Sequence, residues 1–155
     1  MKHVWSVLCQ KSVIDSETNL ISLMDCLEEF NLTIDINKGD NQIPNKLTLP
    51  INFQIVSYWL IDNIDKKLKI KIVLLDPDNK KINELNGDFE LKEKFLRYRT
   101  RINIQGLPVT KGGRYLFKIY RIEENEILKE VSELPLDVKI DYKMPSPDSL
   151  KEKLK

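Results

Sequence analysis

The sequence is poor in the residues that carry most enzyme chemistry. His3 is the only histidine in 155 residues, and Cys9 and Cys26 are the only cysteines. A serine or cysteine nucleophile that depends on histidine would have to use His3, which lies at a terminus that we expect to be frayed and exposed. One histidine and two separated cysteines do not assemble a zinc site from nitrogen and sulfur ligands. We therefore expect no catalytic residue, no metal and no cofactor.

Long apolar runs are missing as well. The apolar start of the chain ends at Cys9, which is too short for the core of a signal peptide. No run approaches the roughly 20 residues that a membrane helix needs. We therefore expect a soluble, cytoplasmic protein. In that compartment Cys9 and Cys26 should both be reduced, and their apolar neighbours indicate that both are buried.

The dominant pattern in the sequence is an alternation of period two. Apolar Leu96, Tyr98 and Ile102 alternate with Arg97, Arg99 and Arg101. Since successive side chains of a strand point to opposite faces, this pattern predicts a half-buried strand. Similar patterns predict strands at 4–10, 53–61, 67–74, 115–119 and 136–140. The apolar residues of 20–30 also fit helical spacing, but we prefer a strand at 19–25 that pairs back on 4–10, followed by a strand at 31–36.

These strands predict an all-β, antiparallel β-sandwich that forms a single domain over residues 2–142. Residues 143–155 are expected to form a flexible tail, in which 149–154 can form a short helix. Pro77 in Asp76–Asn79 predicts a hairpin turn, and we also expect turns at 86–88 and 106–108, which contain Gly87 and Gly106. Residues 40–50, with two prolines, are expected to form a loop.

A calcium site is an alternative for the turn after Leu75, because hard cations prefer oxygen ligands from a tight loop. The side chains that would supply those ligands are Asp76, Asp78, Asn79 and Glu84, with Asp62 and Asp65. Lys80 and Lys81 lie within the same loop and would repel the ion, so a plain turn is favoured.

Three stretches carry a resemblance to known proteins. They are Val7-Leu8-Cys9 through Leu20-Ile21-Ser22-Leu23-Met24, Leu74-Leu75-Asp76-Pro77-Asp78, and 97–108 with Gly113-Arg114-Tyr115-Leu116-Phe117. In these stretches the chain resembles a family of uncharacterised bacterial proteins, a domain of unknown function that is similar to immunoglobulin-like or C2-like β-sandwiches. The resemblance implies that fold, and it supplies no activity and no catalytic residues.

Three aromatic residues are expected to have structural roles. Tyr115 follows Gly113-Arg114 in the position of a tyrosine corner, where the hydroxyl bonds a nearby backbone group in many sandwiches. Trp5 and Trp59 are expected in the core, because large aromatic side chains dominate core burial.

Two basic rows are the candidate binding residues. Arg97, Arg99 and Arg101 project from one face of their strand, and residues 91–101 hold five basic side chains and one acidic one, a net +4. Lys67, Lys69 and Lys71 form a similar row. If the two strands are neighbours, the rows form one positive patch suited to phosphate or carboxylate groups. The alternative is a solvated face, neutralised across the sheet by Glu90, Glu126 or Glu130.

Charge is also distributed unevenly along the chain. Residues 12–37 hold six acidic side chains and no lysine or arginine, a net −6. This segment can pair with the basic rows within one molecule or in a second copy. We therefore hypothesise a non-catalytic binding or assembly module that acts through a sheet face or loops, with a protein partner or a second copy and not a membrane. Nucleic-acid or polyanion binding through Arg97, Arg99 and Arg101 is the alternative, and a carboxylate-based hydrolase is a second, less favoured one.

Overall fold

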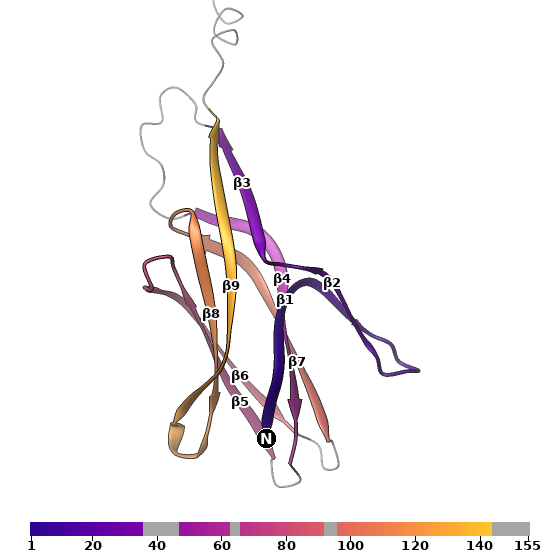
Figure 1. Cartoon of the computed structure of the whole chain (residues 1–155). Coiled ribbons are helices and arrows are strands. Elements are labelled where there is room, and N and C mark those ends of the chain that lie inside the picture. The colour runs from indigo at the N-terminus through magenta and orange to yellow at the C-terminus, as the bar shows by residue number, and fades with distance from the viewer. Residues whose placement is uncertain (36–46, 63–65, 92–95, 144–155) are drawn as a thin grey trace, which may run out of the picture.

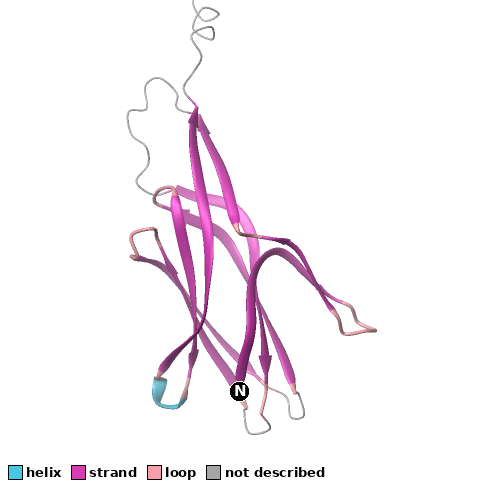
Figure 2. Ribbon diagram, viewed as in Figure 1, coloured by secondary structure: helices cyan, strands magenta, loops and turns pink. Residues whose placement is uncertain are grey.

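The structure is a computed structural model that describes residues 1–35, 47–62, 66–91 and 96–143. Strands account for nearly all of these residues (Figures 1 and 2). They are β1 (Lys2–Ile14), β2 (Ile21–Cys26), β3 (Glu29–Asp35), β4 (Leu47–Leu60), β5 (Lys67–Leu75), β6 (Lys81–Glu90), β7 (Arg97–Val109), β8 (Gly113–Ile122) and β9 (Leu128–Lys143), with one 3-10 turn, η1 (Glu124–Glu126). The all-β prediction is confirmed. The helix expected at 149–154 and most of the loop expected at 40–50 lie outside the described residues.

The strands form two sheets. Sheet A has the order β2-β1-β4-β7, and the strongly curled sheet B has the order β3-β9-β8-β5-β6. Every pair is antiparallel except β3 and β9, which run parallel from Glu29 opposite Asp137 to Asp35 opposite Lys143. The purely antiparallel arrangement predicted from the sequence is therefore wrong at this edge. The chain leaves sheet A after β2 and enters sheet B as β3, and this crossing sets the direction of β3.

The core lies between the two sheets and follows the predicted alternation. In β4, Phe53, Ile55 and Trp59 are buried and point inward. The other buried apolar side chains come mainly from β5, β7, β8 and β9: Leu68, Ile70, Ile72, Leu74, Ile104, Leu107, Val109, Tyr115, Phe117, Ile119, Leu136 and Val138. Burial of these large apolar side chains is the main stabilising contribution to such a fold. Within the described part of the chain, no helix has the length and hydropathy that a membrane crossing requires.

Two of the expected turns are strand interiors. Residues 86–88 lie within β6, where a Cβ on Gly87 would stand 2.7 Å from the Phe89 ring, so this glycine makes room for a neighbouring side chain. Residues 106–108 lie within β7, where Gly106 has a φ of 77° and faces a β-bulge in β4. In both places a glycine inside a strand leaves room for a neighbouring side chain or strand. Glycine is also common in turns, so the local sequence does not distinguish the two roles.

The β1–β2 hairpin confirms the strand interpretation of residues 19–25, with a shifted register. β2 pairs with the second half of β1, from Cys9 opposite Cys26 to Ile14 opposite Ile21, because the first half of β1 pairs with β4. The hairpin projects beyond the body of the sandwich (Figure 1). At its tip, Asp15 Oδ1 accepts hydrogen bonds from the backbone N–H groups of Glu17 and Thr18.

Candidate functional site

The two basic rows lie on different sheets. Arg97, Arg99 and Arg101 belong to β7, the edge strand of sheet A, whereas the lysines belong to β5 inside sheet B. The two strands are not neighbours, so the single patch that the sequence left open does not form. Alternation shows which side chains share a face of one strand, but it does not show which strands lie side by side.

The lysine row is compensated by acidic side chains. Across the β5–β6 pair, Lys67 lies opposite Glu90 and Lys69 lies opposite Asp88. Lys71 Nζ is 3.1 Å from Glu84 Oε2. Hydrogen bonds from Lys81 and Lys71 lower the pKa of Glu84, which remains ionised beside them. The neighbouring strands continue this pattern, since Lys118 contacts both Glu130 and Glu133. The outer face of sheet B is therefore a solvated surface of mixed charge.

The arginine row has no such compensation among the described residues. Arg97, Arg99 and Arg101 lie opposite Leu60, Tyr58 and Val56 of β4, all of them uncharged. Arg97 and Arg101 are exposed, and no described carboxylate forms an ion pair with either. An exposed cation without a nearby anion is available to a partner.

Arg99 is held by the tip of the β1–β2 hairpin. Its Nη1 donates to Asn19 Oδ1 at 3.1 Å, and its Nη2 donates to the Asn19 carbonyl oxygen at 3.0 Å. Asn19 adopts a φ of 54°, a conformation that asparagine tolerates better than most residues. The acidic segment 12–37, which was predicted to attract the basic rows, thus contacts β7 through two uncharged groups. They are the side-chain amide and the backbone carbonyl of Asn19. Arg99 is positioned, while Arg97 and Arg101 stay open to solvent.

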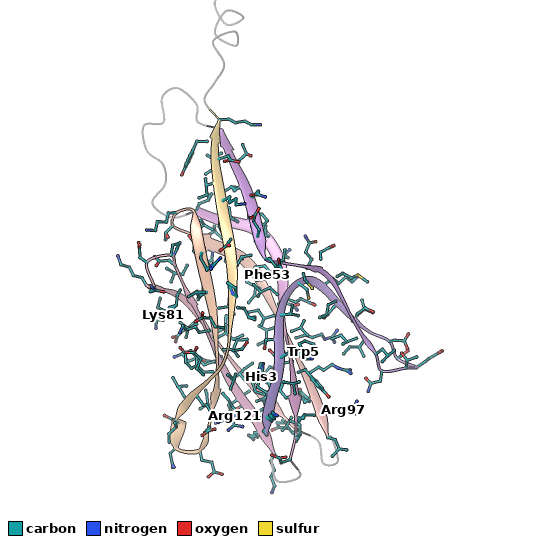
Figure 3. The ribbon with its side chains drawn as sticks, viewed as in Figure 1. His3, Trp5, Phe53, Lys81, Arg97 and Arg121 are labelled. Atoms are coloured by element: carbon teal, nitrogen blue, oxygen red, sulfur yellow. The ribbon has the colours of Figure 1, made fainter. Side chains whose placement is uncertain are left out.

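Trp5 lies on this outer face and not in the core, which corrects the expectation from the sequence. His3 pairs with Trp59 and Trp5 pairs with Tyr58, so Val4 forms a β-bulge between them. The bulge reverses the alternation, and Trp5 faces outward although His3 faces inward. The rings of Trp5 and Tyr58 lie 5.8 Å apart. Trp5, Tyr58 and Arg99 therefore form one row across β1, β4 and β7. Trp5 and Arg97, at the start of β7, are labelled in Figure 3.

His3 belongs to a polar chain between the sheets. Its Nε2 lies 2.7 Å from Ser6 Oγ, which donates to Ser57 Oγ at 2.7 Å, and its ring packs edge-on against Trp59. Burial lowers the pKa of His3. The expectation of a frayed, exposed histidine is wrong, because β1 begins at Lys2 and is paired with β4. The serine at the end of this chain, Ser57, is buried, and the bond from Ser6 satisfies its hydroxyl group there.

The other two structural aromatics are fully buried. Trp59 Nε1 donates to Thr100 Oγ1 at 3.4 Å. The Tyr115 hydroxyl donates to the Lys111 carbonyl oxygen at 2.8 Å and accepts from the Thr110 N–H at 2.9 Å. This is the geometry of a tyrosine corner, which ties the β7–β8 connection to the start of β8.

The acidic side chains of the β5–β6 turn are engaged in the protein. Asp76 Oδ1 accepts the backbone N–H groups of Asp78 and Lys80, each at 2.9 Å. Asp78 bonds Lys111 at 2.5 Å, and this hydrogen bond lowers the pKa of Asp78. Asp62 contacts the amino group of Met1, and Asp65 lies outside the described residues. The loop is thus a hairpin turn fixed by Asp76, with its carboxylates committed to protein donors.

The described residues form a wide depression and a small hollow on the surface. A wide depression of about 790 Å³ lies at the end of the sandwich, between the start of β5 and residues 121–126. Its lysines and Arg121 face three glutamates, and Arg121 is already bonded to Glu123 and to the Met1 carbonyl, so the depression has no field of one sign. The second hollow, between β6 and β7, is apolar and measures about 20 Å³, far below the size of a ligand pocket.

No protein-family model matches this chain, and no curated protein matches it significantly. The assignment of a site therefore rests on the geometry alone. That geometry selects the outer face of sheet A, defined here as Arg97, Arg99, Arg101, Tyr58 and Trp5. Sequence reasoning found the arginines but missed Tyr58, which alternation places on the face opposite the buried Trp59.

Proposed function

We propose that this protein is a non-catalytic binding module with an immunoglobulin-like sandwich fold, and that it binds an acidic protein segment through the outer face of sheet A. Two features support the fold type. The first part of the chain is divided between the sheets, with β3 parallel to β9, and Tyr115 forms a corner at the start of β8. Tyrosine corners of this kind are characteristic of immunoglobulin-like sandwiches.

The observation that carries the proposal is the contrast between the two basic rows. The lysines of β5 face carboxylates on β6, whereas the arginines of β7 face Leu60, Tyr58 and Val56. Guanidinium groups are weakly hydrated and bind carboxylates through two parallel hydrogen bonds. Arginine, tyrosine and tryptophan are also the side chains most enriched in the energetic centres of protein interfaces. The outer face of sheet A combines all three.

An acidic protein fits this face better than a nucleic acid does. The net charge of the chain is +1, and two arginines of the row are open to solvent. Nucleic-acid binding depends on the release of several counterions by several phosphate contacts, and two open cations supply few of them. A carboxylate-rich segment needs only local complementarity.

The test compares two double variants that each remove two positive charges. Arg97→Ala/Arg101→Ala alters the candidate face, and Lys67→Ala/Lys69→Ala is the matched control on sheet B. The probes are poly-glutamate and a single-stranded oligonucleotide at low salt, with binding measured by fluorescence anisotropy. We expect the arginine variant to bind poly-glutamate at least about tenfold more weakly than the wild type, which corresponds to roughly 1.4 kcal/mol, and the lysine variant to bind as the wild type does.

Two outcomes would contradict the proposal. Equal weakening by both variants would mean that only total charge matters. Oligonucleotide binding tighter than poly-glutamate binding, and dependent on Arg97 and Arg101, would replace the acidic protein by a nucleic acid as the partner. Circular dichroism of both variants checks that each retains the strand spectrum of the wild type.

A further inference from the structure

Strand β7 is hydrogen-bonded along one side only. It ends the order of sheet A, and within the described residues it pairs with β4 and with no other strand. On the same side of the sandwich, β6 ends the order of sheet B. An edge strand exposes backbone N–H and C=O groups that can pair with another chain.

The two edges separate along their length and expose apolar core surface between them. Phe89 of β6 and Tyr98 of β7 are in contact, with ring centroids 6.1 Å apart, and they close the gap at one end. Further along, Leu85, Ile104 and Phe117 line the apolar hollow of about 20 Å³. Leu85 pairs with the buried Ile72 and yet is 37% exposed, because nothing in the described part of sheet A covers it.

This hollow is matched to a side chain and not to a free ligand. Small-molecule sites enclose roughly 300–1,000 Å³, so a hollow of about 20 Å³ holds no cofactor or substrate. Its lining is mainly apolar, with Asn83 and Glu84 as the polar members, so an apolar group is favoured there over a polar one. It suits the end of one apolar side chain projecting from a chain that lies along its rim, and β7 forms one side of that rim through Ile104, Gly106 and Pro108.

We propose that the acidic partner binds as an added β-strand along the edge of β7, with acidic and apolar side chains in alternation. This inference rests on the proposed function and names the form of the partner. In such a strand, every second residue would lie beside Arg97, Arg99 or Arg101 on the outer face, and the residues between would lie on the inner face. Where the strand continues beside Ile104, an inner-face residue would point toward the hollow. Cross-strand neighbours of opposite charge stabilise such a pair of strands. A partner strand that alternates acidic and apolar residues places the acidic ones beside the arginines and the apolar ones on the inner face.

A second copy pairing through its own β7 is disfavoured by charge. An antiparallel β7–β7 pair centred on Arg99 would place arginines opposite arginines on one face, and like charges directly opposite each other are destabilising. From Arg97 to Gln105 the strand has neither proline nor glycine, so its edge is regular there. The arginines thus disfavour pairing between the β7 edges of two copies and favour pairing with an acidic strand. Charged side chains on an edge strand can select its partner in this way.

The experiment uses the full chain and three short synthetic peptides. The first alternates glutamate and valine, the second has the same composition with all glutamates before all valines, and the third is the alternating peptide N-methylated at every internal amide. Affinities are measured by fluorescence anisotropy. We expect the alternating peptide to bind at least about tenfold more tightly than the other two. Leu85→Ser should remove part of this preference, and Leu128→Ser, which alters an exposed leucine of β9 away from the β7 edge, should leave it unchanged.

The outcomes separate this inference from the proposed function. If all three peptides bind equally and Arg97→Ala/Arg101→Ala weakens them equally, strand addition is wrong and acidic binding stands. If that variant changes no peptide's affinity, both are wrong. Sedimentation velocity is run in parallel, because a concentration-dependent dimer that Arg97→Ala/Arg101→Ala dissociates would identify a second copy as the occupant and overturn the peptide inference.

Discussion

Cys9 and Cys26 lie directly opposite each other on neighbouring strands, and both are free thiols. Cys9 is fully buried, whereas Cys26 is exposed, so the prediction of two buried thiols is wrong for Cys26. Burial raises the pKa of Cys9, and the adjacent Cys26 adds to this effect. The thiolate is the reactive form of cysteine, so the two residues should differ strongly in reactivity.

The first prediction concerns the rates at which these thiols react. In the native protein, a thiol reagent such as Ellman's reagent should modify one group quickly and the other slowly. Cys26→Ser should remove the fast phase, and Cys9→Ser should remove the slow one. In denaturant under non-reducing conditions, the wild type should show two reactive thiols. Two fast phases in the native state, or no thiols in denaturant, would contradict this prediction.

The second prediction concerns the tyrosine corner. Tyr115→Phe removes a buried hydroxyl that bonds the Lys111 carbonyl and the Thr110 N–H, and it leaves those groups without their partner. The free energy of unfolding should fall by about 1–3 kcal/mol, measured from urea denaturation. Tyr142→Phe is the matched control, because Tyr142 is 44% exposed and should tolerate the change. An equal midpoint for Tyr115→Phe and the wild type would mean that the corner adds no stability.

The alternation of apolar and polar residues was sufficient to predict most strands and their inward faces. Phe53, Ile55 and Trp59 are all buried because they lie on the same face of β4, and that face packs in the core. The same local pattern carries no information about partners in space. The parallel pairing of β3 with β9 depends on contacts between residues about a hundred positions apart in the chain, as Glu29 and Asp137 are.

The candidate site was predictable in part, for related reasons. The arginine row follows from spacing, but its lack of acidic neighbours among the described residues depends on which strand lies beside β7. The outward position of Trp5 depends on the bulge at Val4, one extra residue that reverses the alternation without a proline or glycine to signal it. A β-bulge of this kind is set by the pairing of two strands and not by the sequence of one.

The third prediction concerns pH and His3. Burial lowers the pKa of His3 in the folded protein below its ordinary value of 6.5, which the unfolded chain retains. As the pH falls below 6.5, the unfolded state takes up a proton that folded His3 resists, so stability decreases until the pH reaches the lowered pKa. Urea midpoints from about pH 8 to about pH 5 should show this decrease. His3→Gln, which keeps a hydrogen-bonding group but does not titrate, should show a smaller dependence on pH, and an identical one would mean that another group is responsible.

The fourth prediction concerns Gly106, where β7 meets the bulge of β4. Pro50 and Ile51 of β4 oppose this single residue, and Gly106 adopts a φ of 77° to accommodate them. A Cβ at this position would also stand 2.9 Å from the Thr48 Cγ2 atom. Gly106→Ala should therefore lower the free energy of unfolding through two separable effects, of which the backbone conformation alone costs about 1–2 kcal/mol for a residue with a side chain.

The double variant Gly106→Ala/Thr48→Ser separates the two effects. Serine removes the methyl group that the new Cβ meets, but it does not change the φ that the bulge imposes. We expect urea denaturation to show that the double variant recovers part of the lost stability relative to Gly106→Ala and remains below Thr48→Ser alone. Full recovery would mean that the contact with Thr48 is the whole cost, and that the positive φ of Gly106 relaxes when alanine replaces glycine. An unchanged stability of Gly106→Ala would mean that the bulge does not constrain this residue.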